Sequence, residues 1–262
     1  MGENLKWVAA GVGVVALFAA LFIYFSPRSP VQPATPPVAV APPPPPAEEQ
    51  DVIKHPIAAA PGEAAAPPLE ASDQPLFDAL AGLAGKAPVE QYVIPQDLVR
   101  HFVVTIDNLP TEKVAERVRP MKAVPGKFAV SGPDDAPTLD AANYARYEPL
   151  VKTLQATDTA QLVALYQRYY PLFQQVYEGL GHPPQYFNDR VVEVIDHLLA
   201  TPDVRGPIGL VQPSVQYKYA DPKLEALSAG QKALIRMGSA NATAIKEKLR
   251  ALRAALVAQK PN

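Results

Sequence analysis

The stretch from Asp158 to Leu180 reads DTAQLVALYQRYYPLFQQVYEGL and predicts one long helix that faces a core. Asp158 suits the cap position, where a side-chain oxygen accepts hydrogen bonds from the first free backbone N–H groups. Large apolar and aromatic residues then recur at spacings of three or four, which places them on one helical face. Pro171 has no backbone donor, so we expect the helix to bend or restart there. The expected core stripe consists of Leu162, Tyr166, Tyr169, Phe173 and Tyr177.

Helical patterns continue on both sides of this stretch. The residues from Pro95 to Leu109 carry an apolar helical face, although the β-branched run from Val103 to Ile106 leaves a strand as the alternative. The last segment has a regular apolar stripe, which also predicts a helix. We expect the remaining helices over residues 75–84, 140–157, 188–200, 221–227, 228–237 and 241–258, the last with Ile245, Leu249, Leu252 and Leu256 on its stripe.

Strand signals are few and short. Residues 111–139 are rich in charge, proline and glycine, which predicts an extended excursion over the surface with one strand-like piece at 127–130. Residues 208–219 alternate around Val215, Tyr217 and Tyr219 and predict one or two short strands. The fold class that follows is mainly α: a single helical domain over residues 75–262 with one or two short β-strands.

The chain before this domain has a different composition. Residues 26–74 are rich in proline and alanine and nearly free of aromatic residues, so they bury too little apolar surface to offset the entropy of ordering. We expect a disordered, partly polyproline II spacer. The alternative is that Pro42 to Pro46 dock into an aromatic groove of a partner.

An apolar stretch precedes the spacer. Residues 7–25 contain no charge and cover roughly 28 Å as a helix, about the hydrocarbon thickness of a bilayer. This predicts a transmembrane helix, with residues 1–6 as a short cytoplasmic tail and the helical domain on the opposite side of the membrane. A cleaved signal peptide is the alternative, but no small-x-small cleavage site follows the apolar stretch.

Composition excludes several classes of function. The net charge of −2 provides no field that would attract a phosphate backbone, so nucleic acid is not an expected partner. The chain has no cysteine, which excludes disulfides, thiolate zinc sites and covalently attached haem. The histidines form no HxH or HxxxH pair, and we predict neither a metal nor a cofactor.

One helical face carries residues that can perform acid–base chemistry. Asp189, Glu193 and His197 stand four residues apart and, with Asp196, fall within an arc of about 100°. They are the candidate catalytic residues, since carboxylates and an imidazole on one face can move a proton. The alternative interpretation is the wet face of an amphipathic helix, on which Asn188 and Asp189 cap the helix start.

A second set of polar residues suggests a binding surface. Arginine beside aromatic side chains can build a polar or carbohydrate-binding pocket, and eleven tyrosines are many for packing alone. The alternative is that these residues form internal ion pairs and tyrosine hydrogen bonds that fix the helices. The candidate binding residues are Asp107, Asn108, Tyr144, Arg146, Arg190 and Asp196.

Several segments resemble a Gram-negative bacterial family of membrane-anchored proteins with a proline-rich spacer and a C-terminal domain of unknown function. The resemblance extends from about Leu76 to Ala255 and rests on DNLP (107–110), NYARY (143–147), YPLF (170–173), YFNDRVVEVIDHLLATP (186–202), QPSVQYKYADP (212–222) and LSAGQKALIRMG (227–238). It implies an inner-membrane anchor and a periplasmic domain. It implies no activity, substrate or catalytic residue.

These observations lead to two functional hypotheses. The first is a binding or scaffolding module of the cell envelope, whose partner is an envelope protein or the cell-wall polymer. The second is an envelope hydrolase or lyase that acts on a glycan through the helix face of Asp189, Glu193 and His197. The sequence contains no P-loop, GxSxG, HExxH or SxxK motif that would identify an enzyme class, so it leans toward binding.

Overall fold

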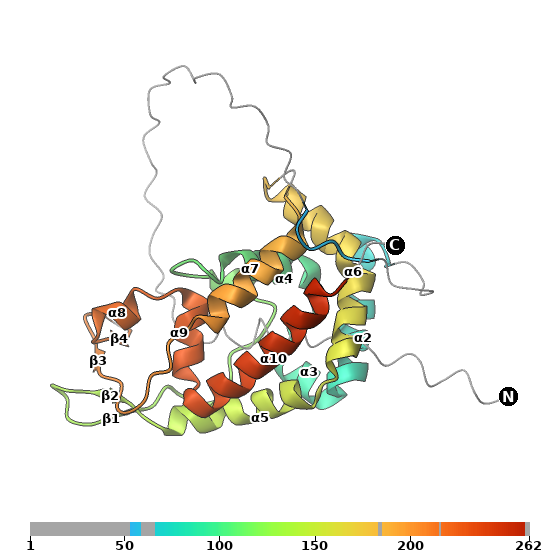
Figure 1. Cartoon of the computed structure of the whole chain (residues 1–262). Coiled ribbons are helices and arrows are strands. Elements are labelled where there is room, and N and C mark those ends of the chain that lie inside the picture. The colour runs from blue at the N-terminus through green and yellow to red at the C-terminus, as the bar shows by residue number, and fades with distance from the viewer. Residues whose placement is uncertain (1–52, 59–65, 183–184, 215, 260–262) are drawn as a thin grey trace, which may run out of the picture.

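The computed structural model describes residues 53–58, 66–182, 185–214 and 216–259 (Figure 1). The predicted cytoplasmic tail (1–6), the predicted transmembrane helix (7–25) and most of the predicted spacer lie outside these residues. Among the helices in the described part of the chain, none is long and apolar enough to cross a membrane.

The described part is a mainly α domain, which confirms the predicted fold class. Two short 3-10 helices and two small antiparallel sheets accompany the α-helices. The helices are η1 (Leu69–Ala71), α2 (Asp73–Ala84), α3 (Lys86–Tyr92), α4 (Leu98–Asn108), η2 (Glu116–Val118), α5 (Ala142–Ala156), α6 (Thr159–Gly179), α7 (Phe187–Leu199), α8 (Pro222–Glu225), α9 (Ala229–Arg236) and α10 (Ser239–Val257). The strands are β1 (Val130–Ser131), β2 (Thr138–Leu139), β3 (Leu210–Val211) and β4 (Lys218–Tyr219).

Helix α6 follows the prediction closely, with one exception. Asp158 caps it by accepting a hydrogen bond from the backbone N–H of Gln161 at 2.9 Å. All five residues of the predicted core stripe are buried. Of the bend or restart expected at Pro171, the restart is excluded, because α6 runs through this residue as one helix. The buried residues on both sides of Pro171, Tyr170 and Leu172, hold the helix in the core, and such packing can outweigh the loss of one backbone bond.

Helix α10 lies at the centre of the helical assembly in Figure 1 and packs against α5, α6, α7 and α9. Its predicted apolar stripe is fully buried: Ile245, Leu249, Leu252 and Leu256. On the other side of α6 and α7 lies α4, which contributes Phe102 to an aromatic cluster with Phe173 and Phe187. Residues 98–108 are therefore helical, and the strand alternative for Val103 to Ile106 is wrong.

The two sheets lie together beside α8 and α9, at the end of the domain away from the N-terminus of α7 (Figure 1). Strand β1 pairs with β2, β3 pairs with β4, and an isolated bridge between Thr138 and Gly209 joins the two hairpins. The predicted strand at 127–130 is wrong for residues 127–129, because β1 begins at Val130, whereas residues 208–219 supply two strands. A small second core forms here from Leu139, Ile208, Leu210, Tyr219 and Ile235.

Two pieces of the predicted spacer have positions in the structure. Residues 66–74 contain η1 and the first turn of α2, so the helical part begins earlier than expected. Residues 53–58 lie against α6 and α7, and we call this segment the strap. The strap brings a region far away in the sequence to the N-terminus of α7, where the candidate site lies.

Candidate functional site

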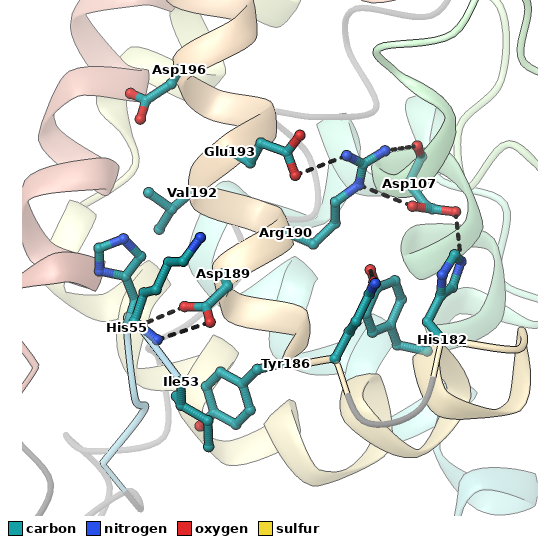
Figure 2. Close-up of a pocket in the computed structure, with 13 residues that line it drawn as sticks. Ile53, His55, Asp107, His182, Tyr186, Asp189, Arg190, Val192, Glu193 and Asp196 are labelled. Atoms are coloured by element: carbon teal, nitrogen blue, oxygen red, sulfur yellow. Dashed lines mark hydrogen bonds and ion pairs between the residues drawn. The ribbon is translucent and has the colours of Figure 1, made fainter. Parts of the chain in front are cut away.

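An open cleft with a volume of about 640 Å³ lies along α7 (Figure 2). One wall is the strap, the opposite wall is the C-terminal end of α4, and the loop between α6 and α7 closes one end. Charged side chains of both signs and two tyrosines line it. The lining residues are Ile53, Lys54, His55, Asp107, Tyr177, His182, Gln185, Tyr186, Asp189, Arg190, Val192, Glu193 and Asp196.

An ion network forms the wall next to α4 (Figure 2). The Arg190 guanidinium donates from Nε to Asp107 Oδ1 at 3.0 Å and from Nη1 to Glu193 Oε2 at 2.9 Å. It also donates from Nη2 to the backbone carbonyl of Asp107 at 2.7 Å. His182 Nε2 lies 3.3 Å from the second carboxylate oxygen of Asp107. We call these four residues the Arg190 network; it ties α4, α7 and the preceding loop together.

The electrostatics of this network follow from partial burial and close charges. Burial by itself lowers the pKa of Arg190, but hydrogen bonding and charge from Glu193 and Asp107 raise it above its ordinary value overall. Arg190 therefore remains charged. Burial raises the pKa of the neighbouring Tyr177, and the charge of Asp107 adds to the rise. The Tyr177 ring stacks on the His182 ring with centroids 4.6 Å apart, which positions the imidazole beside Asp107.

The wall formed by the strap is held through its main chain. The Asp189 carboxylate accepts hydrogen bonds from the backbone N–H of Lys54 at 3.0 Å and of His55 at 2.7 Å (Figure 2). The Tyr186 hydroxyl accepts one from the N–H of Ile57 at 3.0 Å. Asn188 Nδ2 donates to the carbonyl of His55 at 2.8 Å. Side chains of α7 and of the residue before it thus form hydrogen bonds with the backbone of the strap.

These contacts change the predicted role of two residues. Asn188 and Asp189 were expected to cap α7, but their side chains bond to the strap instead. The first N–H groups of α7 are satisfied by α6: Gln174 Oε1 accepts from Phe187 at 2.8 Å, and the Tyr170 hydroxyl accepts from Asn188 at 3.2 Å. Burial raises the pKa of Tyr170 far above its ordinary value, so its hydroxyl stays protonated.

The three candidate catalytic residues do not share one set of partners. Asp189 and Glu193 both line the cleft, the first bonded to the strap and the second to Arg190. His197 is not among the lining residues, and its Nε2 lies 2.8 Å from Oγ of Ser228 at the start of α9. Burial lowers the pKa of His197, and the charge of Arg190 lowers it further against an opposing effect of Glu193.

The candidate binding residues divide in the same way. Asp107 and Arg190 lie in the cleft and contact each other. Asp196 is at its edge, where its carboxylate accepts a hydrogen bond from Arg253 Nη2 of α10 at 2.8 Å. Asn108 donates to the carbonyl of Val104 within α4.

Arg146 and Tyr144 lie away from the cleft and serve the loops around α5. The Arg146 guanidinium donates to the carbonyls of Val124, Pro125 and Gly126 and to Asn143 Oδ1, so it fixes the turn before β1. Tyr144 packs against the second core, and its carbonyl accepts from Asn241 Nδ2 at 2.9 Å. The structure therefore joins Asp107, Arg190 and Glu193 from the two helices, but not Arg146 or His197.

Sequence reasoning missed several residues of the cleft. His182, Gln185 and Tyr186 come from the loop before α7, and the strap comes from a segment assigned to the spacer. A signal for the loop is present, because Tyr186 is the first residue of the YFNDRVVEVIDHLLATP segment (186–202) on which the family resemblance rests. The strap offered a weaker signal: Ile53 and Ile57 are the only isoleucines in a spacer that otherwise contains mostly proline and alanine.

The chemistry available here is recognition by charge, hydrogen bonds and aromatic faces. Within residues 53–58, 66–182, 185–214 and 216–259, no group of three or more histidine and carboxylate side chains is placed to hold a metal ion. The Arg190 network pairs one guanidinium with the carboxylates of Asp107 and Glu193, and Glu193 is its most exposed member, with 67% of its side chain accessible. A ligand that replaces these internal ion pairs would contact both a positive guanidinium and negative carboxylates.

The structure is a mainly α domain with a polar cleft along α7. Residues 98–253 match the family model described as Protein of unknown function (DUF3014). The match covers more than half of the chain, and the protein belongs to this family. The Arg190 network lies inside the matched region and the strap lies outside it. No curated protein and no solved structure matches the chain.

Proposed function

We propose that the protein is a binding module of the bacterial cell envelope, anchored in the inner membrane by residues 7–25, with a periplasmic domain that uses the cleft along α7 to contact its partner. The observation that carries the proposal is the convergence of α4, α7 and the preceding loop on the Arg190 network. Separate parts of the chain bring Asp107, His182 and Arg190 to one concave surface, and such convergence is typical of a ligand site.

The state of the polar groups favours binding over catalysis. A general base needs a free lone pair that faces the substrate, and a nucleophile needs an adjacent base. Asp107 and Arg190 are engaged with each other, and Asp189 is engaged with the strap. A cleft of paired charges can instead exchange its internal ion pairs for pairs with a partner, which gives specificity.

The expected partner is an envelope protein or the cell-wall polymer. Both present mixed charges, and a polymer of sugars and short peptides also suits the partly exposed ring of Tyr186 in this cleft. The proline-rich residues between the predicted anchor and the domain would allow the cleft to reach a partner away from the membrane surface.

The alternative function, a hydrolase or lyase acting on an envelope glycan, has one observation in its favour. Asp189 and Glu193 are two carboxylates that line the same cleft as two tyrosines, and glycosidases use carboxylate pairs with sugar platforms. Incubation of the purified chain with cell-wall fragments tests it: release of soluble sugar that Glu193→Gln abolishes would support the enzyme, and fragments that remain intact would exclude it for these substrates.

Crosslinking in intact cells tests the binding proposal. We expect Glu193→Lys to lose the captured partner, because the substitution reverses the charge of the most exposed network residue. Lys152→Glu is the matched control, a charge reversal on α5 at a side chain that is 74% exposed, and it should retain the partner. If Glu193→Lys folds normally and captures the same species as the natural chain, the proposal is wrong. Cosedimentation of both variants with cell-wall fragments applies the same comparison to the polymer.

A further inference from the structure

The strap is held almost entirely through its backbone. Besides the four hydrogen bonds to Asp189, Tyr186 and Asn188, Gln167 Nε2 of α6 donates to the carbonyl of Ala58 at 3.3 Å. Three N–H groups and two carbonyls are thus recognised in six residues. Backbone recognition of this kind gives affinity for any segment that adopts the same backbone conformation.

The positions along the strap also carry a sequence preference. The successive N–H groups of Lys54 and His55 donate to the Asp189 carboxylate. Pro56 follows, and the N–H of Ile57 donates to the Tyr186 hydroxyl. Proline has no backbone N–H, and it is suited to the middle position because none of the hydrogen bonds that hold the strap uses a donor there. Its fixed φ angle also reduces the entropy lost on binding. Ile57 packs against the main core, whereas Ile53 is 50% exposed. One aliphatic residue after the proline is therefore the side-chain anchor.

We propose that the groove formed by α6, α7 and Tyr186 is a binding site for a peptide segment that takes the strap's backbone conformation and has the pattern of two residues, a proline and an aliphatic residue. The strap is its ligand within the same chain, and a partner's segment of that pattern displaces it. The inference rests on the proposed function and deepens it, because the strap and the Arg190 network line one cleft. It identifies the partner as a protein that presents such a segment.

The attachment of the strap makes it an autoinhibitory ligand. Only residues 59–65 separate it from the rest of the described domain, and a short linker holds a ligand at an effective concentration on the order of millimolar. A peptide supplied from outside competes against that concentration. Removal of the strap's contacts should therefore strengthen external peptide binding by at least about tenfold.

Fluorescence anisotropy with the full chain tests this directly. The probe is a labelled synthetic peptide, DVIKHPIAAA, which corresponds to residues 51–60. In one variant, residues 53–58 are replaced by six glycine and serine residues so that the chain length is kept. We expect the peptide to bind this variant at least about tenfold more tightly than the natural chain. Equal affinity for the two chains, or binding to neither, would overturn the inference.

Two further substitutions in the replaced chain locate the binding. Asp189→Ala removes the acceptor of two strap N–H groups and should abolish peptide binding. Glu112→Ala is the matched control, because this carboxylate is 77% exposed and does not line the cleft; it should leave the affinity unchanged. An equal loss in both, or no loss with Asp189→Ala, contradicts the assignment of the groove.

Amide hydrogen exchange in the otherwise natural chain covers the case in which the replaced chain does not fold. The amides of Lys54, His55 and Ile57 should exchange more slowly than unprotected amides, and Asp189→Ala should accelerate the first two. Unprotected amides at all three positions would overturn the inference. The peptide groove and the proposed function can fail independently. If a partner is captured in cells in a way that depends on Glu193 but no peptide binds, the peptide groove is refuted and the proposed binding function stands.

Discussion

At the scale of single residues, Arg190 organises the cleft. Its side chain is 21% exposed and that of Asp107 is 18% exposed, so the charge pair is shielded from water on most sides. Shielding strengthens the attraction between the charges and raises the cost of leaving one of them unpaired. The same arginine also bonds to Glu193, whose side chain is mostly in solvent. The two carboxylates should therefore contribute unequally.

The first prediction follows from this difference. Asp107→Asn keeps the size of the side chain but removes the charge that faces Arg190, and we expect it to lower the free energy of unfolding by about 1–2 kcal/mol. Glu193→Gln removes an exposed charge and should change it by less than about 0.5 kcal/mol. Urea denaturation followed by circular dichroism measures both, and equal effects would show that the network is not shielded as described.

The second prediction concerns His197, whose pKa is lowered by burial from an ordinary value of 6.5. In the unfolded chain this imidazole takes up its proton at a higher pH than in the folded chain. The unfolded state therefore binds more protons as pH falls through about 6.5 toward the lower folded pKa, and stability decreases over that window. Above about pH 6.5 the contribution of neutral His197 to stability is fully present.

Comparison with His197→Gln isolates this contribution. The free energy of unfolding of the natural chain minus that of the variant should be larger at about pH 7.5 than at about pH 5. Glutamine retains a polar group that can reach Oγ of Ser228, so the variant is expected to fold. A difference that stays constant with pH, or increases toward acid, would show that His197 is not held in its neutral form.

At the scale of secondary-structure elements, the junction between α9 and α10 depends on one glycine. Gly238 has φ of 84° and ψ of 156°, a backbone conformation that is essentially limited to glycine. A Cβ atom at this position would lie 2.6 Å from Cγ of Tyr144. The ring is fixed near its attachment to the backbone and has little freedom to move aside. The junction therefore excludes any side chain on two independent grounds.

We predict that Gly238→Ala lowers the free energy of unfolding by about 3 kcal/mol, the sum of backbone strain and overpacking. Gly181→Ala is the matched control, because Gly181 also has a positive φ of 92° but its Cβ would meet nothing within 4 Å. It should cost about 1–2 kcal/mol, from strain alone. Thermal or urea unfolding compares the two, and equal losses would contradict the close approach of Tyr144.

The elements also show which parts of the structure can be predicted from sequence. Periodicity located α6 and α10 and their buried stripes because a helix repeats its environment every three or four residues. It missed α3, in which Pro88 lies in the first turn, a position where proline is tolerated. It also left a bend or a restart open at Pro171, because the packing that holds α6 together comes from other helices.

The cleft was less predictable than the fold. Asp107, Arg190 and Glu193 were all candidates, but their convergence depends on how α4 crosses α7, and local spacing contains no such information. Arg146 and His197 were candidates with the same residue chemistry, and tertiary packing gave them structural partners instead. The strap could not be inferred from composition, because the hydrogen bonds that hold it are made by its backbone and Ile57 adds one side-chain contact with the core.

At the scale of the whole molecule, the proposed arrangement is a helical domain whose cleft is linked to the membrane helix by the proline-rich spacer. The strap begins at Ile53, so residues 26–52 would separate it from the predicted membrane helix. Release of the strap would extend this connection to residue 65 and lengthen the reach of the domain. Under the proposal, displacement of the strap by a partner therefore opens the groove and frees more tether in a single step.

The central claim is that the cleft along α7 is the surface that meets the partner. The most direct measurement places a photoreactive amino acid at Glu193 in the full chain in intact cells, and at Lys152 as the control, and compares the crosslinked species. We expect the probe at Glu193 to crosslink to a discrete partner and the probe at Lys152 not to crosslink to it. The same species from both positions, or none from Glu193 in a stably folded chain, would contradict it.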